Sequence, residues 1–105
     1  MLNTVLIGGQ IDSSKWSKNK TGFYVTITQK RKFGNKIFTD FFVIYANDEL
    51  GQKLSEYVQN HEHLFVKGVL TTYQDKKTKI WKTQILAEKI LVNHDKTLTN
   101  QQEEN

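Results

Sequence analysis

The chain has 105 residues, no cysteine, no proline and a net charge of +4 at pH 7, with a pI near 9.3. This length fits one domain with a single core, and the lack of cysteine excludes disulfides, thiolate metal sites and cysteine nucleophiles. No stretch approaches the roughly 20 apolar residues of a membrane span and no signal peptide is recognisable, so we expect a cytoplasmic protein without membrane contacts.

The first half of the chain predicts three strands. Residues 3–11 are predicted as the first strand, and the Gly8-Gly9 pair within it indicates a bulge or a sharp bend. Residues 21–31 alternate apolar and polar side chains, which is the clearest strand signal in the chain. Residues 33–36 (FGNK) are typical of a hairpin tip. The return strand, residues 37–46, is dense in aromatic and β-branched residues, which predicts burial on both of its faces.

A helix and two further strands are predicted after this hairpin. Asn47 or Asp48 can cap the helix, and apolar residues follow at helical spacing up to Val58. Residues 63–73 and 80–92 are predicted as strands, joined by a lysine-rich loop. Because the apolar content then falls, we expect a domain over residues 1–93 and a disordered polar tail over residues 94–105.

This order of elements is that of an OB-fold. Three strands, a helix and two more strands give an all-β domain with one helix, a five-stranded Greek-key barrel whose helix lies between strands 3 and 4. The absence of proline agrees with barrel strands that donate hydrogen bonds throughout. In such barrels, the face of strands 2 and 3 and the adjoining loops bind oligonucleotides or oligosaccharides.

Positive charge is concentrated in two windows without acidic residues. Seven cations lie between residues 15 and 36, and four lie between residues 76 and 82. The windows coincide with predicted strand 2 with its flanking loops, and with the loop between strands 4 and 5. This coincidence favours a nucleic-acid site over lysines that serve only solubility. The candidate phosphate contacts are Lys30, Arg31, Lys32, Lys36, Lys76, Lys77, Lys79 and Lys82.

Five segments resemble the bacterial single-stranded-DNA-binding proteins, in order and at compatible spacings. They are NTVLIG at 3–8, DFF at 40–42, LSEYV at 54–58, VKGVL at 66–70 and TQILAE at 83–88, so that the resemblance spans residues 1–92. It implies an OB-fold that binds single-stranded DNA without sequence preference and supports replication, repair or recombination. It also implies a nucleoid-associated protein that self-associates to a dimer or tetramer.

The resemblance also implies which aromatic residues stack on bases. Phe33 falls at the stacking position of the hairpin after strand 2, Phe41 at the position that opens strand 3, and Trp81 at an aromatic position early in strand 5. Two positions depart from the pattern, because Asn47 and Asp75 stand where relatives carry aromatics.

The remaining aromatics divide into candidates and core. Tyr73 is a candidate substitute for the aromatic missing two residues later, and Trp16 either stacks a base or covers the rim of the barrel. Phe23, Phe38, Phe42 and Phe65 alternate with other apolar residues and are predicted as core. Fourteen of the fifteen cations are lysine, which lacks the planar fork that reads guanine, so binding is expected to ignore sequence.

Other functions have weaker support in the sequence. His61-Glu62-His63 lacks a third ligand at a recognised spacing, so we expect no metal, no cofactor and no enzymatic activity. Two alternatives stay open: an OB-fold protein-interaction module of the primosomal replication protein N type, and an RNA-binding OB domain. The chain ends with two acidic residues and no apolar tip, which argues against recruitment of replication enzymes through an acidic tail.

Overall fold

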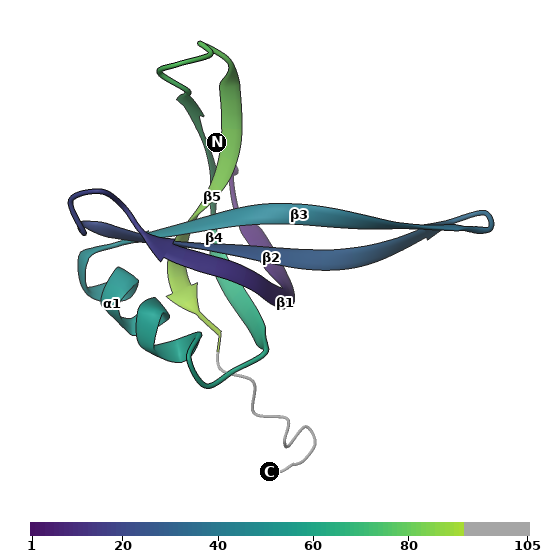
Figure 1. Cartoon of the computed structure of the whole chain (residues 1–105), viewed down its shortest axis with the longest axis horizontal. Helices are drawn as coiled ribbons and strands as arrows, with labels where there is room; N and C mark the ends of the chain where they lie inside the picture. The colour runs from purple at the N-terminus through teal and green to yellow at the C-terminus, as the bar shows by residue number, and fades with distance from the viewer. Residues whose placement is uncertain (92–105) are drawn as a thin grey trace.

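The computed structural model describes residues 1–91, which form a closed barrel of five strands with one helix (Figure 1). The elements are β1 (Val5–Trp16), β2 (Gly22–Phe33), β3 (Lys36–Asn47), α1 (Asp48–Tyr57), β4 (His63–Gln74) and β5 (Trp81–Ile90). The strands are neighbours in the order β1-β2-β3-β5-β4. The predicted OB-fold is therefore confirmed, whereas the predicted tail over residues 94–105 lies outside the described residues. Within residues 1–91 no helix is long and apolar enough to cross a membrane.

Strand β1 closes the barrel because it pairs with two neighbours. Its residues 5–10 pair with β4, and its residues 10–16 pair with β2. Both pairings are antiparallel, and the bulge in β1 lies between Ile11 and Ser13. Of the two alternatives predicted at Gly8-Gly9, the bulge is wrong, since both glycines keep a regular register with β4, and the sharp bend stays a prediction.

The two glycines are instead explained by close packing. A Cβ atom on Gly8 would collide with the ring of Phe65, which lies directly opposite on β4. A Cβ atom on Gly9 would lie 2.5 Å from the backbone oxygen of Thr28. Glycine thus lets a side chain and a neighbouring backbone approach this strand from two directions.

The core lies inside the barrel and contains inward-facing side chains of β2 to β5 and α1. The largest fully buried side chains are Ile27, Ile44, Leu54, Leu64, Val25 and Val66. The predicted period of two in β2 is borne out, because Phe23, Val25 and Ile27 are buried while the residues between them are not. Leu54 extends the core from the barrel to α1.

The prediction that the third strand is buried on both faces is wrong. In β3 only Ile44 and Ala46 are buried, and the half nearer the turn is exposed except for Thr39 and Asp40, which are half-buried. Figure 1 shows the cause: the β2–β3 hairpin extends well beyond the barrel, so that its distal half has no layer to pack against. The β4–β5 hairpin extends from the barrel in a different direction.

Two of the four phenylalanines predicted as core are exposed. Phe23 is buried and Phe42 packs against the core, but Phe38 and Phe65 are exposed. Phe38 belongs to the protruding half of the hairpin. Apolar and polar residues alternate there as well, but no core lies beneath them, so the apolar side chains stay exposed. Phe65 lies between the buried residues Leu64 and Val66, so its side chain points to the outer surface of the barrel.

Candidate nucleic-acid interface

The β2–β3 hairpin has one face that combines lysines with an exposed aromatic ring. Lys30 lies opposite Thr39 and Lys32 lies opposite Ile37, and Lys30 Nζ donates a hydrogen bond to Thr39 Oγ1 at 2.8 Å. Phe41, two residues after Thr39, points to the same side and is 62% exposed. We call the face that carries Lys30, Lys32 and Phe41 the lysine face.

The opposite face of the hairpin carries Arg31 and Asp40. Arg31 Nε donates to Asp40 Oδ2 at 2.9 Å, and Arg31 Nη2 donates to Asp40 Oδ1 at 3.1 Å. The guanidinium carbon lies 5.0 Å from the ring centre of Phe38. The hydrogen bonds from Arg31 lower the pKa of Asp40 below its usual value, so the pair is fully charged at neutral pH.

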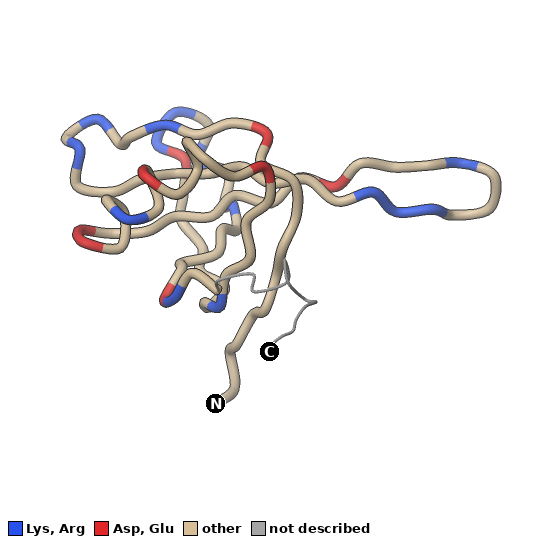
Figure 2. The backbone as a smooth tube through the Cα atoms, turned by 90° about the horizontal axis from the view of Figure 1, so that it is seen from below, with Lys and Arg blue, Asp and Glu red and all other residues tan. Residues whose placement is uncertain are grey.

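The predicted site residues of this hairpin are therefore divided between its two faces. Lys30 and Lys32 point to one side, while Arg31, Phe33 and Lys36 lie at register positions of the other. Phe33 is 73% exposed at the tip, so it is as accessible as its predicted role requires. Figure 2 shows several cationic positions and a single acidic position along this arm.

An open groove of about 760 Å³ adjoins the lysine face. Thr26 and Val43, which lie opposite each other on β2 and β3, line the groove and belong to the same side of the sheet as Lys30. Lys15, Trp16, Lys18, Tyr24 and Tyr73 also line it. The groove and the lysine face thus form one continuous surface over β1, β2 and β3.

Tyr24, Lys15 and Lys18 of this groove were missed by the sequence analysis as site residues. The rings of Tyr24 and Tyr45 lie 4.6 Å apart, and Lys15 Nζ lies 6.0 Å from the Tyr24 ring centre. Burial raises the pKa of Tyr24, and the nearby Tyr45 and Tyr73 add to this, so its hydroxyl stays protonated at neutral pH. The alternation along β2 predicts that Tyr24 points away from the core. Its proximity to Tyr73 could not be predicted in this way, because Tyr73 lies on β4, which does not pair with β2.

The structure supports the packing alternative for Trp16, and the alternative that it stacks a base stays a prediction. Its ring packs edge to face on the buried Phe23, with 5.0 Å between ring centres, and so covers one end of the core. It is also 36% exposed and lines the groove. The geometry therefore gives Trp16 a packing role and leaves part of its surface accessible.

The β4–β5 hairpin also has two different faces. Tyr73 lies opposite Lys82, and the next pair, Gln74 and Trp81, points to the other side. Trp81 is 66% exposed, which suits a stacking residue. Lys82 Nζ lies 3.3 Å from Asp75 Oδ2, so this lysine is held by a carboxylate rather than placed beside the indole.

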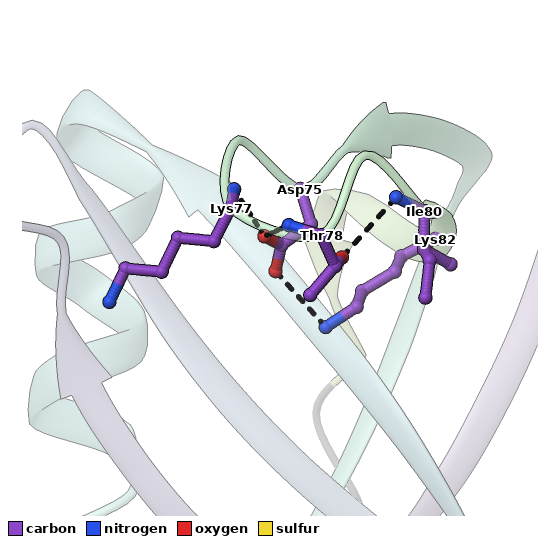
Figure 3. A network of polar contacts seen from close by, with 5 residues as sticks. All are labelled: Asp75, Lys77, Thr78, Ile80 and Lys82. Atoms are coloured by element: carbon purple, nitrogen blue, oxygen red, sulfur yellow. Dashed lines mark hydrogen bonds and ion pairs between the residues drawn. The ribbon is translucent and has the colours of Figure 1, made fainter.

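Asp75 organises the loop that joins β4 and β5 (Figure 3). Its Oδ1 atom accepts hydrogen bonds from the backbone N–H of Lys77 at 2.8 Å and of Thr78 at 3.1 Å. These bonds, together with the one from Lys82, lower the pKa of Asp75. An aspartate at this position thus shapes the turn that displays Lys76, Lys77 and Lys79, all of which are exposed.

The histidine motif is not arranged as a metal site. The His61 ring stacks on the Tyr57 ring at 3.8 Å, and its Nδ1 atom bonds to the Tyr57 carbonyl oxygen at 2.9 Å. Among the side chains of residues 1–91, no three histidine, aspartate or glutamate groups gather as metal ligands would.

A family model described as "Protein of unknown function (DUF3217)" matches residues 1–104 of the chain. The uncharacterized protein MG376 of Mycoplasma genitalium is 48% identical over 103 residues, which cover 98% of this chain and 99% of that protein. Its homolog in Mycoplasma pneumoniae is 48% identical over 90 residues, which cover 86% of each chain.

Two solved structures share the fold. The crystal structure of a small single-stranded DNA binding protein from Mycoplasma pneumoniae has a TM-score of 0.84 at 47% identity, and the match covers 88% of this chain and 94% of that one. The Plasmodium falciparum SSB, solved in complex with single-stranded DNA, has a TM-score of 0.58 at 17% identity over 83% of this chain and 87% of that one. The second likeness is one of fold alone.

Proposed function

We propose that this chain, which belongs to the DUF3217 family and to the OB-fold single-stranded-DNA-binding proteins, binds single-stranded DNA without sequence preference. The observation that carries the proposal is the continuous surface formed by the groove and the lysine face, on which cations and exposed aromatic rings lie together. The 47% identity to a small single-stranded DNA binding protein supports the same function.

In this proposal the phosphates and the bases use different residues of that surface. Lys15 and Lys18 at the groove and Lys30 and Lys32 on the hairpin hold phosphates and release counterions. Bases stack on Phe41, which contributes about 1 to 3 kcal/mol per base whatever the base is. Lysine ammonium groups hold phosphate oxygens without reading base edges, so the binding is blind to sequence.

The second hairpin extends the path of the strand. Tyr73 joins the groove from β4, and the loop beyond it displays three exposed lysines. Phe33 and Trp81 point away from the lysine face and from Tyr73, respectively. A strand that stacks on these two residues as well must therefore pass around the edges of both hairpins, and short oligonucleotides will not engage all the aromatics.

The biological role follows from the chemistry of the ligand. A protein that coats single-stranded DNA without cutting or modifying it serves replication, repair or recombination, and acts by binding rather than by catalysis. The proposal includes self-association to a dimer or tetramer and a nucleoid location, both of which rest on the resemblance to bacterial single-stranded-DNA-binding proteins.

The test compares three ligands at one salt concentration: an oligothymidine, an oligouridine of the same length and a duplex of that length. The proposal expects the tightest binding to the oligothymidine. A preference for the RNA would instead favour an RNA-binding OB domain. Binding to none of the three would favour a protein-interaction module.

A matched pair of variants locates the surface. The double substitution of Lys30 and Lys32 by glutamine removes two charges from the lysine face, whereas the same change at Lys53 and Lys89 removes two exposed charges beside α1. We expect the first variant to bind oligothymidine much more weakly than the second. Equal losses would mean that only the net charge of the protein matters and that the lysine face is not the DNA-binding surface.

A further inference from the structure

Asp40 is the only acidic residue between residues 22 and 47, which form the β2–β3 hairpin. It holds Arg31, the only arginine of the chain, through two hydrogen bonds of 2.9 and 3.1 Å. This two-point geometry is the one that a guanidinium offers to a carboxylate or to a phosphate alike. Asp40 therefore occupies one two-donor edge of Arg31 that a DNA phosphate could use, and its negative charge opposes a phosphate at the remaining donors.

The fold has little need of this ion pair. Both side chains are at the surface, where water and salt ions screen them, and exposed ion pairs contribute little to stability. Within residues 1–91 the carboxylate of Asp40 bonds to Arg31 and to no backbone group. In this it differs from Asp75, which binds a cation on the second hairpin but also shapes a loop.

We infer that Asp40 is an internal competitor for the DNA phosphate at Arg31. While the carboxylate is in place, Arg31 adds little to DNA affinity. Arg31 lies on the face opposite Lys30 and Lys32, so a released guanidinium would engage a strand that passes around the edge of the hairpin toward Phe33. The effect is to keep binding weaker and more easily reversed than the cation content of the hairpin allows. The inference rests on the proposed function and specifies that Arg31 is the cation of the hairpin that Asp40 keeps from contacting DNA.

The test replaces Asp40 by asparagine and measures the affinity for oligothymidine at several salt concentrations. A released Arg31 adds one phosphate contact, so the log-log salt slope should become steeper by about 0.7. The same relation predicts an affinity about eightfold higher at about 50 mM monovalent salt. Glu62→Gln, which removes an exposed carboxylate outside the hairpin, is the matched control and should change the affinity much less.

Two further variants check that the gain acts through Arg31. Arg31→Gln alone should weaken binding less than Lys32→Gln does, because only the lysine contacts phosphate in the wild type. In the Arg31→Gln background, Asp40→Asn should have no larger effect than Glu62→Gln. Circular dichroism melting should show all of these variants folded, and if Asp40→Asn fails to fold, Asp40→Ser takes its place, since serine also removes the carboxylate.

Three results would overturn the inference. Equal effects of Asp40→Asn and Glu62→Gln would mean that Asp40 acts only through net charge. A loss of affinity in Asp40→Asn would mean that Asp40 positions Arg31 for DNA, and a loss in Arg31→Gln as large as in Lys32→Gln would mean that Arg31 is not withheld. Absence of any binding by the wild type would refute the proposed function instead, so the two failures are distinguishable.

Discussion

At the scale of single residues, the alternation of side chains along a strand decides which residues can act together. Neighbours in sequence point to opposite faces, so Lys30 and Arg31 do not share a surface although both lie in one cationic window. The same rule separates Trp81 from Lys82 on β5. A window of charge in a sequence therefore identifies a hairpin arm, and only the register of the strands identifies a binding face.

The two tryptophans give the first prediction at this scale. Trp81 is 66% exposed on the second hairpin, so oligothymidine should quench intrinsic fluorescence through it. Trp81→Ala should cost about 1 to 3 kcal/mol in binding free energy. Trp81→Phe should remove most of the quenching and keep much of the affinity, because phenylalanine still stacks. Fluorescence titration measures both quantities.

Trp16 provides the contrast. Because its ring packs on the buried Phe23, Trp16→Ala should lower the melting temperature, with about 0.5 to 1.5 kcal/mol lost from the aromatic pair in addition to the lost burial. Trp81→Ala should leave the melting temperature nearly unchanged. If Trp81→Ala destabilised the fold and left the affinity intact, Trp81 would be a packing residue and not a stacking one.

At the scale of elements, Asp75 gives a prediction for pH dependence. Its pKa is lowered in the folded protein, so its contribution to stability is present above the usual aspartate value near 3.9 and is lost as the pH falls through the lowered value. Asp75→Asn should therefore melt at a lower temperature than the wild type at neutral pH. This difference should begin to shrink below about pH 4, where Asp75 of the unfolded chain becomes protonated, and should vanish as the pH falls through the lowered pKa of the folded protein.

The affinity of this variant tests what the loop is for. If the turn held by Asp75 displays the lysines of the second hairpin to DNA, Asp75→Asn should weaken binding to oligothymidine at neutral pH despite the gain of one positive charge. A rise in affinity equal to that of Glu62→Gln would show that Asp75 acts only as a charge and that the shape of the loop does not matter.

Strand β1 gives a second prediction at this scale. The Cβ atom of Gly9→Ala would lie 2.5 Å from the Thr28 backbone oxygen, and a backbone cannot move aside as a flexible side chain can. We expect a loss of about 1 to 3 kcal/mol in the free energy of unfolding, measured by denaturant titration. Gly34→Asn is the control, because asparagine tolerates the positive φ of +63° at the tip and nothing lies within 4 Å. Equal losses would contradict the steric explanation.

Local patterns predicted most elements of the fold, and the exceptions have physical reasons. The alternation over residues 21–31 located β2 to within a few residues, because it has one face in the core. The first strand was predicted to end at residue 11 but continues to Trp16. Residues 12–16 are exposed and mostly polar, so they show no alternating pattern. They form a strand because they pair with β2, and their own sequence does not indicate this pairing.

The candidate site could be predicted only in part. The two cationic windows and the exposed rings of Phe33 and Trp81 were visible in the sequence. The Arg31–Asp40 pair was within reach, since a hairpin tip at residues 33–36 fixes the register that brings these residues together. The groove was not predictable, because Tyr24 and Tyr73 come from β2 and β4, which are not paired with each other in the barrel.

At the scale of the whole molecule, a small barrel carries two projecting hairpins that hold most of the candidate contacts (Figures 1 and 2). The core stabilises the barrel, and the barrel determines where the two hairpins start and in which direction they extend. The hairpins can therefore expose aromatic rings that a core would otherwise bury, as Phe41 and Trp81 do. This division separates the residues that determine stability from those proposed to determine affinity.

The last prediction follows from this separation and concerns salt. If the surface contacts about five phosphates, the log-log slope of affinity against salt concentration should be about −3 to −4, since each contact on a single strand contributes about −0.7. Replacing Lys30 and Lys32 by glutamine should make the slope shallower by about 1.4, equally for oligothymidine and for a mixed sequence. Trp81→Ala should lower the affinity without changing the slope, because stacking releases no counterions. A wild-type slope near zero would remove the electrostatic part of the mechanism, and a loss confined to one sequence in the lysine variant would mean that these lysines read bases.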